Sequence, residues 1–304
     1  MKIILLFLFC LFSFVLAEQV TPKEVTNYNV LHQSITYENQ NYTILRSFIQ
    51  ENESYFLIVN EKSLKTKIIK QELLRNKIQN TPHQSRYNDI LNQYNNAPYP
   101  IYNYGLKHID TQNTYLTIDM CPSSKVGYER AFFKELIDKY YKGKAIALTI
   151  FVSGKWIEKH QKNFLELLEL QKSGFLDITW GNHTFSHPYN KKLENEKNFL
   201  LMPKVDVEKE ILENEKLLLS YGIAPTIVLR FPGLISNEKV VKTIKALGLI
   251  SVGTDTWMNK SEHIHNGSII LIHGNKNEPH GIKRANDELL EHNNFFLGSL
   301  LDDI

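Results

Sequence analysis

The chain has 304 residues, of which 42% are apolar and 22% charged, and this is an ordinary composition for a globular protein. A formal charge of +2 gives no electrostatic reason to expect nucleic acid or an anionic membrane as a partner. A chain of this length can bury one large core and carry a small appended domain.

The amino-terminal segment, residues 1–17, begins with a single lysine, continues as an unbroken apolar run and ends at the small residue Ala17. This pattern is typical of a cleaved secretory signal, and the segment is short for a membrane span. We therefore expect a secreted protein, periplasmic or extracellular, without stable membrane insertion after cleavage. The mature chain then keeps one cysteine, Cys121, so no internal disulfide can form.

Residues 18–110 are expected to form a small accessory region. From Thr21 to about Lys70 the apolar residues alternate with polar ones, which predicts a few short antiparallel strands. Two short helical stretches are expected over 71–78 and 86–94. The turn-rich segment 95–105 contains two prolines and one glycine among its Asn and Tyr residues, and it marks the predicted domain boundary.

From residue 111 to 304, apolar runs of strand length alternate with segments of helical period. The predicted strands lie within 114–118, 145–152, 175–180, 226–231, 248–253 and 268–273. The predicted helices lie within 127–141, 155–174, 205–222, 237–248 and 284–293. Repeated strand and helix units of this kind predict an α/β fold with a parallel sheet covered by helices. Periodicity alone does not choose between a closed or distorted (β/α) barrel and a doubly wound open sheet.

In both architectures ligand sites form at the carboxyl ends of the strands. Five polar side chains follow predicted strands at this end: Asp119, His183, Arg230, Asp255 and His273. Chance would scatter such residues between the two ends of the sheet. We therefore expect a functional site at the carboxyl end.

Two histidines, His183 and His187, lie four residues apart just past a predicted strand. At that spacing both can bind one divalent cation such as zinc, provided that further ligands complete the shell. The alternative is a pair of ordinary surface histidines in a loop.

Three of the remaining polar residues can carry acid and base chemistry. Asp119 can act as a base toward water, Arg230 can hold that carboxylate through paired hydrogen bonds, and His273 can donate a proton to a leaving group. Taken singly, each has a structural alternative: a helix cap, an ion pair and a satisfied core histidine. Asp255 can orient a histidine, and Trp257 can form an apolar wall for a sugar or be a packed core aromatic.

Five segments, in this order, resemble the motifs of the polysaccharide deacetylase family, also called carbohydrate esterase family 4. They are LTIDMCP at 116–122, HTFSH at 183–187, RFP at 230–232, DTW at 255–257 and GSIILIH at 267–273. The second fits the family's metal-binding pattern at every defined position. The resemblance covers roughly Asn113 to the carboxyl terminus.

The resemblance implies a distorted (β/α) barrel and metal-dependent removal of acetyl groups from a polysaccharide such as peptidoglycan or an exopolysaccharide. Carried over by position, Asp119 is the catalytic base, steadied by Arg230, and His273 is the general acid. His183 and His187 are the metal ligands, with zinc as the expected metal. Asp255 is a further catalytic residue, and Trp257 and Pro232 are substrate contacts.

One departure from the family concerns the metal site. The family's second aspartate, a metal ligand, falls on Met120 here, and the following glycine falls on Cys121. Three outcomes are open: weak binding by two histidines and water, substitution by the Cys121 thiolate, or a metal-free site. Because consecutive residues leaving a strand point to opposite sides, geometry is expected to disfavour Cys121 as a substitute.

The sequence therefore predicts a secreted hydrolase that removes acetyl groups, N-acetyl rather than O-acetyl, from a cell-envelope or extracellular polysaccharide. The alternative raised by Met120 is a catalytically silent glycan-binding barrel. A third hypothesis, a metal-independent amidohydrolase of the same superfamily, is disfavoured by the secretory signal.

Overall fold

The computed structural model describes residues 21–74, 78–79, 84–122, 127–292 and 295–304. The predicted signal segment, 1–17, lies outside these residues. Within the described ranges, no helix combines the length and the apolar character that a bilayer crossing requires.

The amino-terminal region is an antiparallel sheet with the strand order β4-β3-β2-β1-β5. Its strands are β1 (Val25–Tyr37), β2 (Gln40–Gln50), β3 (Glu53–Asn60), β4 (Thr66–Lys70) and β5 (Ile78–Gln79). The hairpins from β1 to β2 and from β2 to β3 both turn on the dipeptide Glu-Asn, at 38–39 and 51–52, with positive φ at both residues. Two residues with positive φ give the turn that matches the twist of paired strands, and asparagine tolerates that conformation.

The two helices expected in this region form to different extents. The second is α2 (Arg86–Gln93), whose first turn is capped by the Ser85 side chain. Of the first, the described residues form the 3₁₀ turn η2 (Gln71–Leu74), and Ile78, its predicted last residue, belongs to β5, which pairs with β1.

The second sheet is parallel throughout, with the order β10-β9-β8-β7-β6-β12-β11 and with β13 beside the start of β6. Its strands are β6 (Asn113–Met120), β7 (Ile146–Val152), β8 (Leu176–Asn182), β9 (Val228–Leu229), β10 (Ile250–Ser251), β11 (Thr256–Trp257), β12 (Ile269–His273) and β13 (Phe296–Leu297). All six predicted strands are present, although β9 and β10 are only two residues long. The two-residue strands β11 and β13 were not predicted.

Helices connect these strands. They are α3 (Arg130–Tyr140), α4 (Gly154–Lys159), α5 (Gln161–Lys172), α6 (Val207–Ser220), α7 (Glu238–Ala246), α8 (Pro279–Ala285) and α9 (Leu300–Asp303). Short turns are η3 (Asn195–Lys197), η4 (Phe199–Leu201), η5 (Pro232–Leu234) and η6 (Met258–Lys260), and the π-helix η7 (Asn286–His292) extends α8. The predicted helix over 155–174 divides into α4 and α5 at His160.

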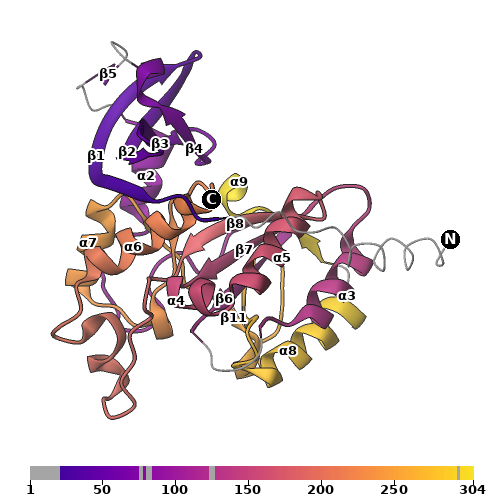
Figure 1. The fold of residues 1–304 in the computed structure, drawn as a ribbon. Helices are drawn as coiled ribbons and strands as arrows, with labels where there is room; N and C mark the ends of the chain where they lie inside the picture. The colour runs from indigo at the N-terminus through magenta and orange to yellow at the C-terminus, as the bar shows by residue number, and fades with distance from the viewer. Residues whose placement is uncertain (1–20, 75–77, 80–83, 123–126, 293–294) are drawn as a thin grey trace.

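The strand order decides between the two architectures. Each strand from β6 to β10 is added on the same side of its predecessor, whereas a doubly wound sheet reverses direction at a switch point. Residues 106–109 then bridge the β10 edge of the sheet and the start of β12: Leu106 pairs with Val252 beside β10, and His108 pairs with Ser268 just before β12. The sheet is a curled half-barrel covered by helices, which confirms the expected (β/α) barrel class (Figure 1).

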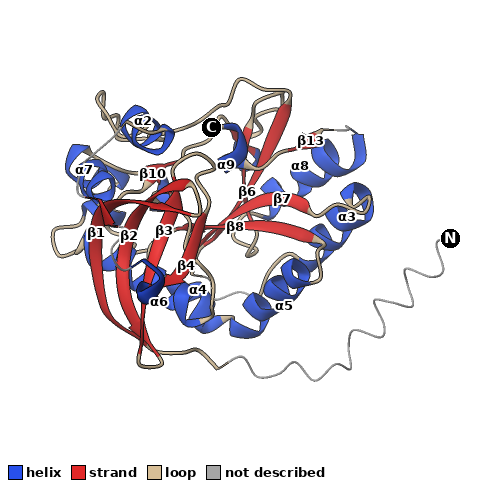
Figure 2. Ribbon diagram, turned by 90° about the horizontal axis from the view of Figure 1, so that it is seen from above, coloured by secondary structure: helices blue, strands red, loops and turns tan. Residues whose placement is uncertain are grey.

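Alternate side chains of β6 face two different cores. Leu116, Ile118 and Met120 pack with α3, α4 and α5, which lie along the outer face of the sheet (Figure 2). Tyr115 faces the opposite core, which also holds Leu45 of β2 together with residues of β3 and α2. The amino-terminal sheet therefore shares a hydrophobic core with the inner side of the half-barrel.

A buried ion pair links the amino-terminal sheet to helix α6. Arg46 on β2 donates from Nε and Nη2 to the Oε2 and Oε1 atoms of Glu215 on α6, at 2.8 and 3.0 Å. Tyr28 of β1 donates its hydroxyl proton to the same carboxylate at 2.7 Å. Neither charged side chain reaches solvent, since Arg46 is 0% and Glu215 1% exposed.

We predict that Glu215→Ala destabilises the protein by roughly 3–5 kcal/mol, because it leaves the Arg46 guanidinium buried without a counter-charge. Replacing both partners by apolar residues, Arg46→Met with Glu215→Leu, removes that unpaired charge and costs much less. Denaturant unfolding measures both variants. Lys23→Ala, which breaks the exposed pair with Glu51, is the matched control and changes little. A small effect of Glu215→Ala would contradict this account of the interface.

Candidate active site

The end of β6 supplies two side chains to the inner side of the sheet. Asp119 and Cys121 both point inward, whereas Met120 between them is fully buried in the outer core. The backbone here is held from two neighbours: Ser153 donates its hydroxyl proton to the Met120 carbonyl at 2.8 Å, and Asn275 donates from Nδ2 to the Cys121 carbonyl at 2.6 Å. The alternation of a strand therefore presents residues 119 and 121 together.

The two histidines come from the loop that follows β8. Thr184 and His187 have φ values of 65° and 47°, a conformation that costs energy for residues with a Cβ and persists only where the surroundings impose it. Asn182 accepts a hydrogen bond from the Thr184 amide at 2.8 Å. Glu210 of α6 accepts hydrogen bonds from the amide and the hydroxyl of Ser186, at 2.7 and 2.5 Å.

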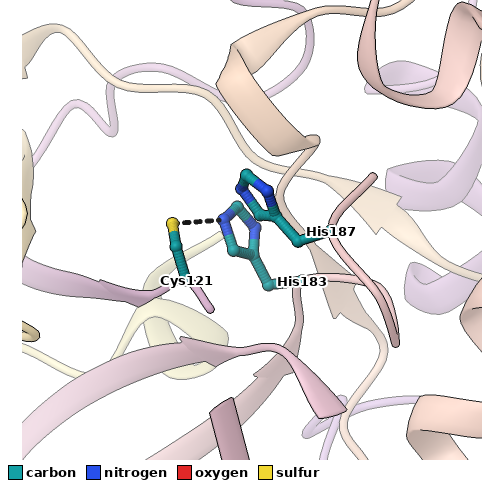
Figure 3. Close-up of side chains that lie close together, drawn as sticks. All are labelled: Cys121, His183 and His187. Atoms are coloured by element: carbon teal, nitrogen blue, oxygen red, sulfur yellow. Dashed lines mark hydrogen bonds between the residues drawn. The ribbon is translucent and has the colours of Figure 1, made fainter. Parts of the chain in front are cut away.

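Cys121, His183 and His187 converge, as Figure 3 shows, with one ligand atom of each lying within 4.8 Å of the others. Cys121 Sγ is 3.5 Å from His183 Nε2. The other ring nitrogen of His183, Nδ1, is 2.9 Å from the Arg230 carbonyl oxygen. This contact fixes the orientation of the ring, and Nε2 then faces the cysteine. The expectation that geometry disfavours Cys121 is wrong, because the site lies on the side to which Cys121 points.

The electrostatics of the group favour a thiolate. Burial raises the pKa of the Cys121 thiol, but the three histidines around it, above all His187, outweigh burial and bring this pKa well below its usual value. Burial lowers the pKa of His183, yet the negative charges of Asp119 and Cys121 raise it overall. One thiolate and two imidazoles are ligands that suit zinc, so the residues present fit a metal ion.

Asp119 and Arg230 form a second buried pair. Arg230 donates from Nη1 to Asp119 Oδ1 at 2.8 Å and from Nη2 to the Gly253 carbonyl at 2.7 Å. Its guanidinium also lies over the Phe151 ring, 4.4 Å from the ring centroid. The second carboxylate oxygen, Oδ2, faces His183 Nε2 at 3.8 Å.

His273 ends β12 directly beside Asp119 in the parallel register. Its Nδ1 is 2.8 Å from Glu278 Oε2, and the same oxygen accepts a hydrogen bond from Trp257 Nε1 at 2.9 Å. Burial lowers the pKa of His273, but Cys121, Glu278 and Asp119 raise it well above the ordinary value. The structure thus brings five predicted residues around Cys121: Asp119, His183, His187, Arg230 and His273.

Two predicted site residues lie elsewhere. Asp255 faces two histidines, His108 and His265, but they lie near the amino end of β12, away from the candidate site, so it is not a catalytic residue there. Pro232 is buried in η5, where it shapes the turn after Arg230 and offers no surface to a substrate. These two assignments are corrected by the positions of the side chains.

Four functional neighbours were not predicted. Glu278 takes the position expected of Asp255, while Asn275, Asn182 and Glu210 hold the backbone of the site. Glu278 and Asn275 lie within five residues of His273, in the segment GNKNEP, but no spacing rule singles them out. Glu210 is 23 residues beyond His187 and reaches the loop only because α6 packs beside it.

Two family models match the chain. Residues 107–252 match the model described as polysaccharide deacetylase, and residues 26–99 match the model described as the RP012 protein N-terminal domain. The resemblance predicted from the motifs is therefore confirmed, and the chain carries a polysaccharide deacetylase domain. Polysaccharide deacetylases are hydrolases. The fifth motif, with His273, lies beyond the matched residues.

Several solved structures are similar. A family 4 carbohydrate esterase from Bacillus anthracis is 22% identical, with 73% of this chain and 93% of that chain covered and a TM-score of 0.46. A family 4 carbohydrate esterase from Streptomyces lividans, in complex with acetate, is 16% identical, with 59% and 90% covered and a TM-score of 0.39. A family 4 pseudoenzyme from Bacillus anthracis is 14% identical, with 90% and 89% covered and a TM-score of 0.46.

We predict that Glu210→Ala loosens the histidine loop while the fold persists, because the Ser186 amide and hydroxyl lose a charged acceptor worth about 1.5–3 kcal/mol per bond. Hydrogen exchange of the peptide covering 183–188 should become faster. Glu213→Ala is the matched control on the same helix, since its carboxylate pairs with Lys216 at the surface. Unchanged protection of the loop in Glu210→Ala would contradict the proposed clamp.

Proposed function

We propose that this protein is a secreted deacetylase that hydrolyses N-acetyl groups, in preference to O-acetyl groups, on a cell-envelope or extracellular polysaccharide. The observation that carries the proposal is the pairing of Asp119 with Arg230, and of His273 with Glu278, on adjacent strands. A base and an acid, each held by a fixed partner, face one thiolate and two imidazoles. The apolar segment 1–17 supports secretion.

On the base side, Arg230 occupies Oδ1 of Asp119, so Oδ2 remains to accept a proton from water. The water oxygen then bonds to the acetyl carbon. Because Arg230 is fully buried and also donates to main-chain carbonyls, the carboxylate is held in one orientation. Fixing the base in this way avoids reorganisation during the reaction.

On the acid side, Glu278 engages Nδ1 of His273, so the protonated ring keeps Nε2–H as the donor. That proton passes to the amide nitrogen of the substrate as the bond from the acetyl carbon to nitrogen breaks. The products are acetate and a free amine. Glu278 acts as a positioning residue, because it touches His273 rather than the reacting atoms.

Cys121, His183 and His187 would hold the metal, for which zinc is the best match. When bound, the ion supplies Lewis acidity at the acetyl carbonyl. His183 is oriented for this role by the Arg230 carbonyl at Nδ1.

Two aromatic rings can flank a sugar. Trp257 stands beside His273, with 6.5 Å between the ring centroids. Tyr189 is 61% exposed and packs on Phe199, which in turn contacts His187. Of the two rings, Tyr189 is exposed and Trp257 is half-buried with Lys260 Nζ over its ring at 4.2 Å. Aromatic rings near acid and base groups favour a carbohydrate over a compact polar substrate.

We predict that the zinc-loaded protein releases acetate from N-acetylated glycans, tested on peptidoglycan and on chitooligosaccharides. Asp119→Asn and His273→Ala should lower the rate by about 10²–10⁴, the usual contribution of a general base or acid. Glu278→Gln should lower kcat and leave KM unchanged. His280→Ala, an exposed histidine that contacts Ser261 and none of the proposed acid, base or metal residues, is the control.

Different outcomes separate the alternatives. No acetate release from any acetylated glycan would contradict the proposal. Zinc binding and glycan binding without turnover would favour the silent binding barrel suggested by Met120. If Glu278→Gln lowers the Tm and its loss of activity is explained by the unfolded fraction, the role of that carboxylate is purely structural.

We predict that Cys121→Ala loses about one zinc equivalent per chain, as His183→Ala does, because each removes one of three ligands. Cys121→Asp should retain zinc with lower affinity, since it places a carboxylate on the same side of the strand. Competition with a chromogenic chelator measures both. Zinc content unchanged in Cys121→Ala, with loss in His183→Ala, would show that the thiolate is not a ligand.

A further inference from the structure

A second group of potential ligands lies outside the candidate active site. His108 precedes β6, Asp255 precedes β11, and His265 lies in the turn before β12. One ligand atom of each falls within 4.8 Å of the other two. Three separate segments of the chain therefore bring two imidazoles and one carboxylate to one point.

The two oxygens of Asp255 have different tasks. Oδ1 accepts a hydrogen bond from the Ile269 amide at 2.8 Å and one from the Thr256 hydroxyl at 3.2 Å. Oδ2 lies 2.8 Å from His108 Nδ1 and 3.3 Å from His265 Nε2. The main chain thus orients the carboxylate so that one oxygen faces both rings.

His265 is oriented from its far side. Its Nδ1 is 2.9 Å from the Ser268 hydroxyl and 3.3 Å from the His263 carbonyl. A proton on Nδ1 can therefore bond to oxygen, which leaves the lone pair of Nε2 directed at Asp255. Fixing one ring nitrogen so that the other is free to coordinate is the usual arrangement around metal-bound histidine.

The turn that carries His265 closes tightly on His108. The His108 and His265 rings are nearly parallel, with 5.5 Å between their centroids. Gly267 has a φ of +82°, and a Cβ there would lie 2.2 Å from the Ile109 carbonyl oxygen and 2.4 Å from the His108 ring. Only glycine permits this approach, so the backbone itself holds the two rings together.

This group is distinct from the candidate active site. Asp255 lies level with Ile269 at the amino end of β12, whereas His273 ends the same strand. Four residues of strand separate the two levels by about 13 Å. The group instead lies where residues 106–109 bridge the β10 edge of the sheet and the start of β12.

We propose that His108, Asp255 and His265 form a second divalent metal site, of the class that takes zinc. Two imidazoles and a carboxylate suit such an ion, and water completes the shell. The side chains of His108 and His265 are 43% and 56% exposed, so the ion is exchangeable with solvent. Its role is structural, because it cross-links the three segments that close the half-barrel.

Zinc content of the full chain, measured by elemental analysis after dialysis against a trace of free zinc, tests the proposal. The wild type should hold about two zinc ions, His183→Ala about one, His265→Ala about one, and the double variant none. His280→Ala is the matched exposed-histidine control and should equal the wild type. Asp255→Asn keeps an oxygen for the Ile269 amide and should also lose one ion.

Thermal unfolding in the His183→Ala background gives a second readout. Added zinc should raise the Tm of His183→Ala but not that of His183→Ala with His265→Ala, because only the former keeps a site in the folded state. If His265→Ala holds one zinc ion fewer than the wild type and His183→Ala holds as many as the wild type, the result supports this site and contradicts the active-site metal. Zinc content that is the same in His265→Ala as in the wild type would overturn the proposal.

Discussion

The candidate site depends on one interaction, the buried ion pair of Asp119 and Arg230. Asp119 is 3% and Arg230 0% exposed, and two charges so far from water are stable only when they are paired and fully hydrogen-bonded. Arg230 also donates from Nε and Nη2 to the Val252 and Gly253 carbonyls, so the pair also joins the ends of β6, β9 and β10. The position of the base and the curvature of the sheet are therefore coupled.

Features that depend on local sequence could be predicted, whereas those that depend on contacts between distant segments could not. Six strands and their helices follow from apolar runs, because burial on both faces leaves a continuous signal. The lengths of β9 and β10 do not, since they depend on how Leu106 and its neighbours enter the gap in the sheet. The pairing of Asp119 with Arg230, 111 residues apart, was suggested by their places at the carboxyl ends of predicted strands and then by the family resemblance, because no local pattern links the two residues.

Asp255 and Glu278 show where the motif assignment fails. The motif gives Asp255 a place in the order of the chain, but β11 begins beside the start of β12, so the carboxylate reaches Ile269 rather than His273. Glu278 reaches His273 because the chain turns back before α8. The carboxylate is also held there by a hydrogen bond from Trp257 Nε1, a contact that no local pattern encodes.

Met120 and Cys121 are best understood as one coupled exchange. The family carries a carboxylate at the first position and a glycine at the second, whereas here an apolar side chain and a thiol occupy them. In this backbone the Met120 side chain fills the outer core, so a charged side chain at position 120 would be buried among apolar residues. The space is tightly filled, because a Cβ on Gly274 would collide with the terminal methyl of Met120. In the proposed site, Cys121 would supply a negative ligand one residue later, on the inward side, and a soft thiolate favours zinc over harder cations. On the proposed assignment, the exchange preserves the charge of the ligand set and narrows the choice of metal.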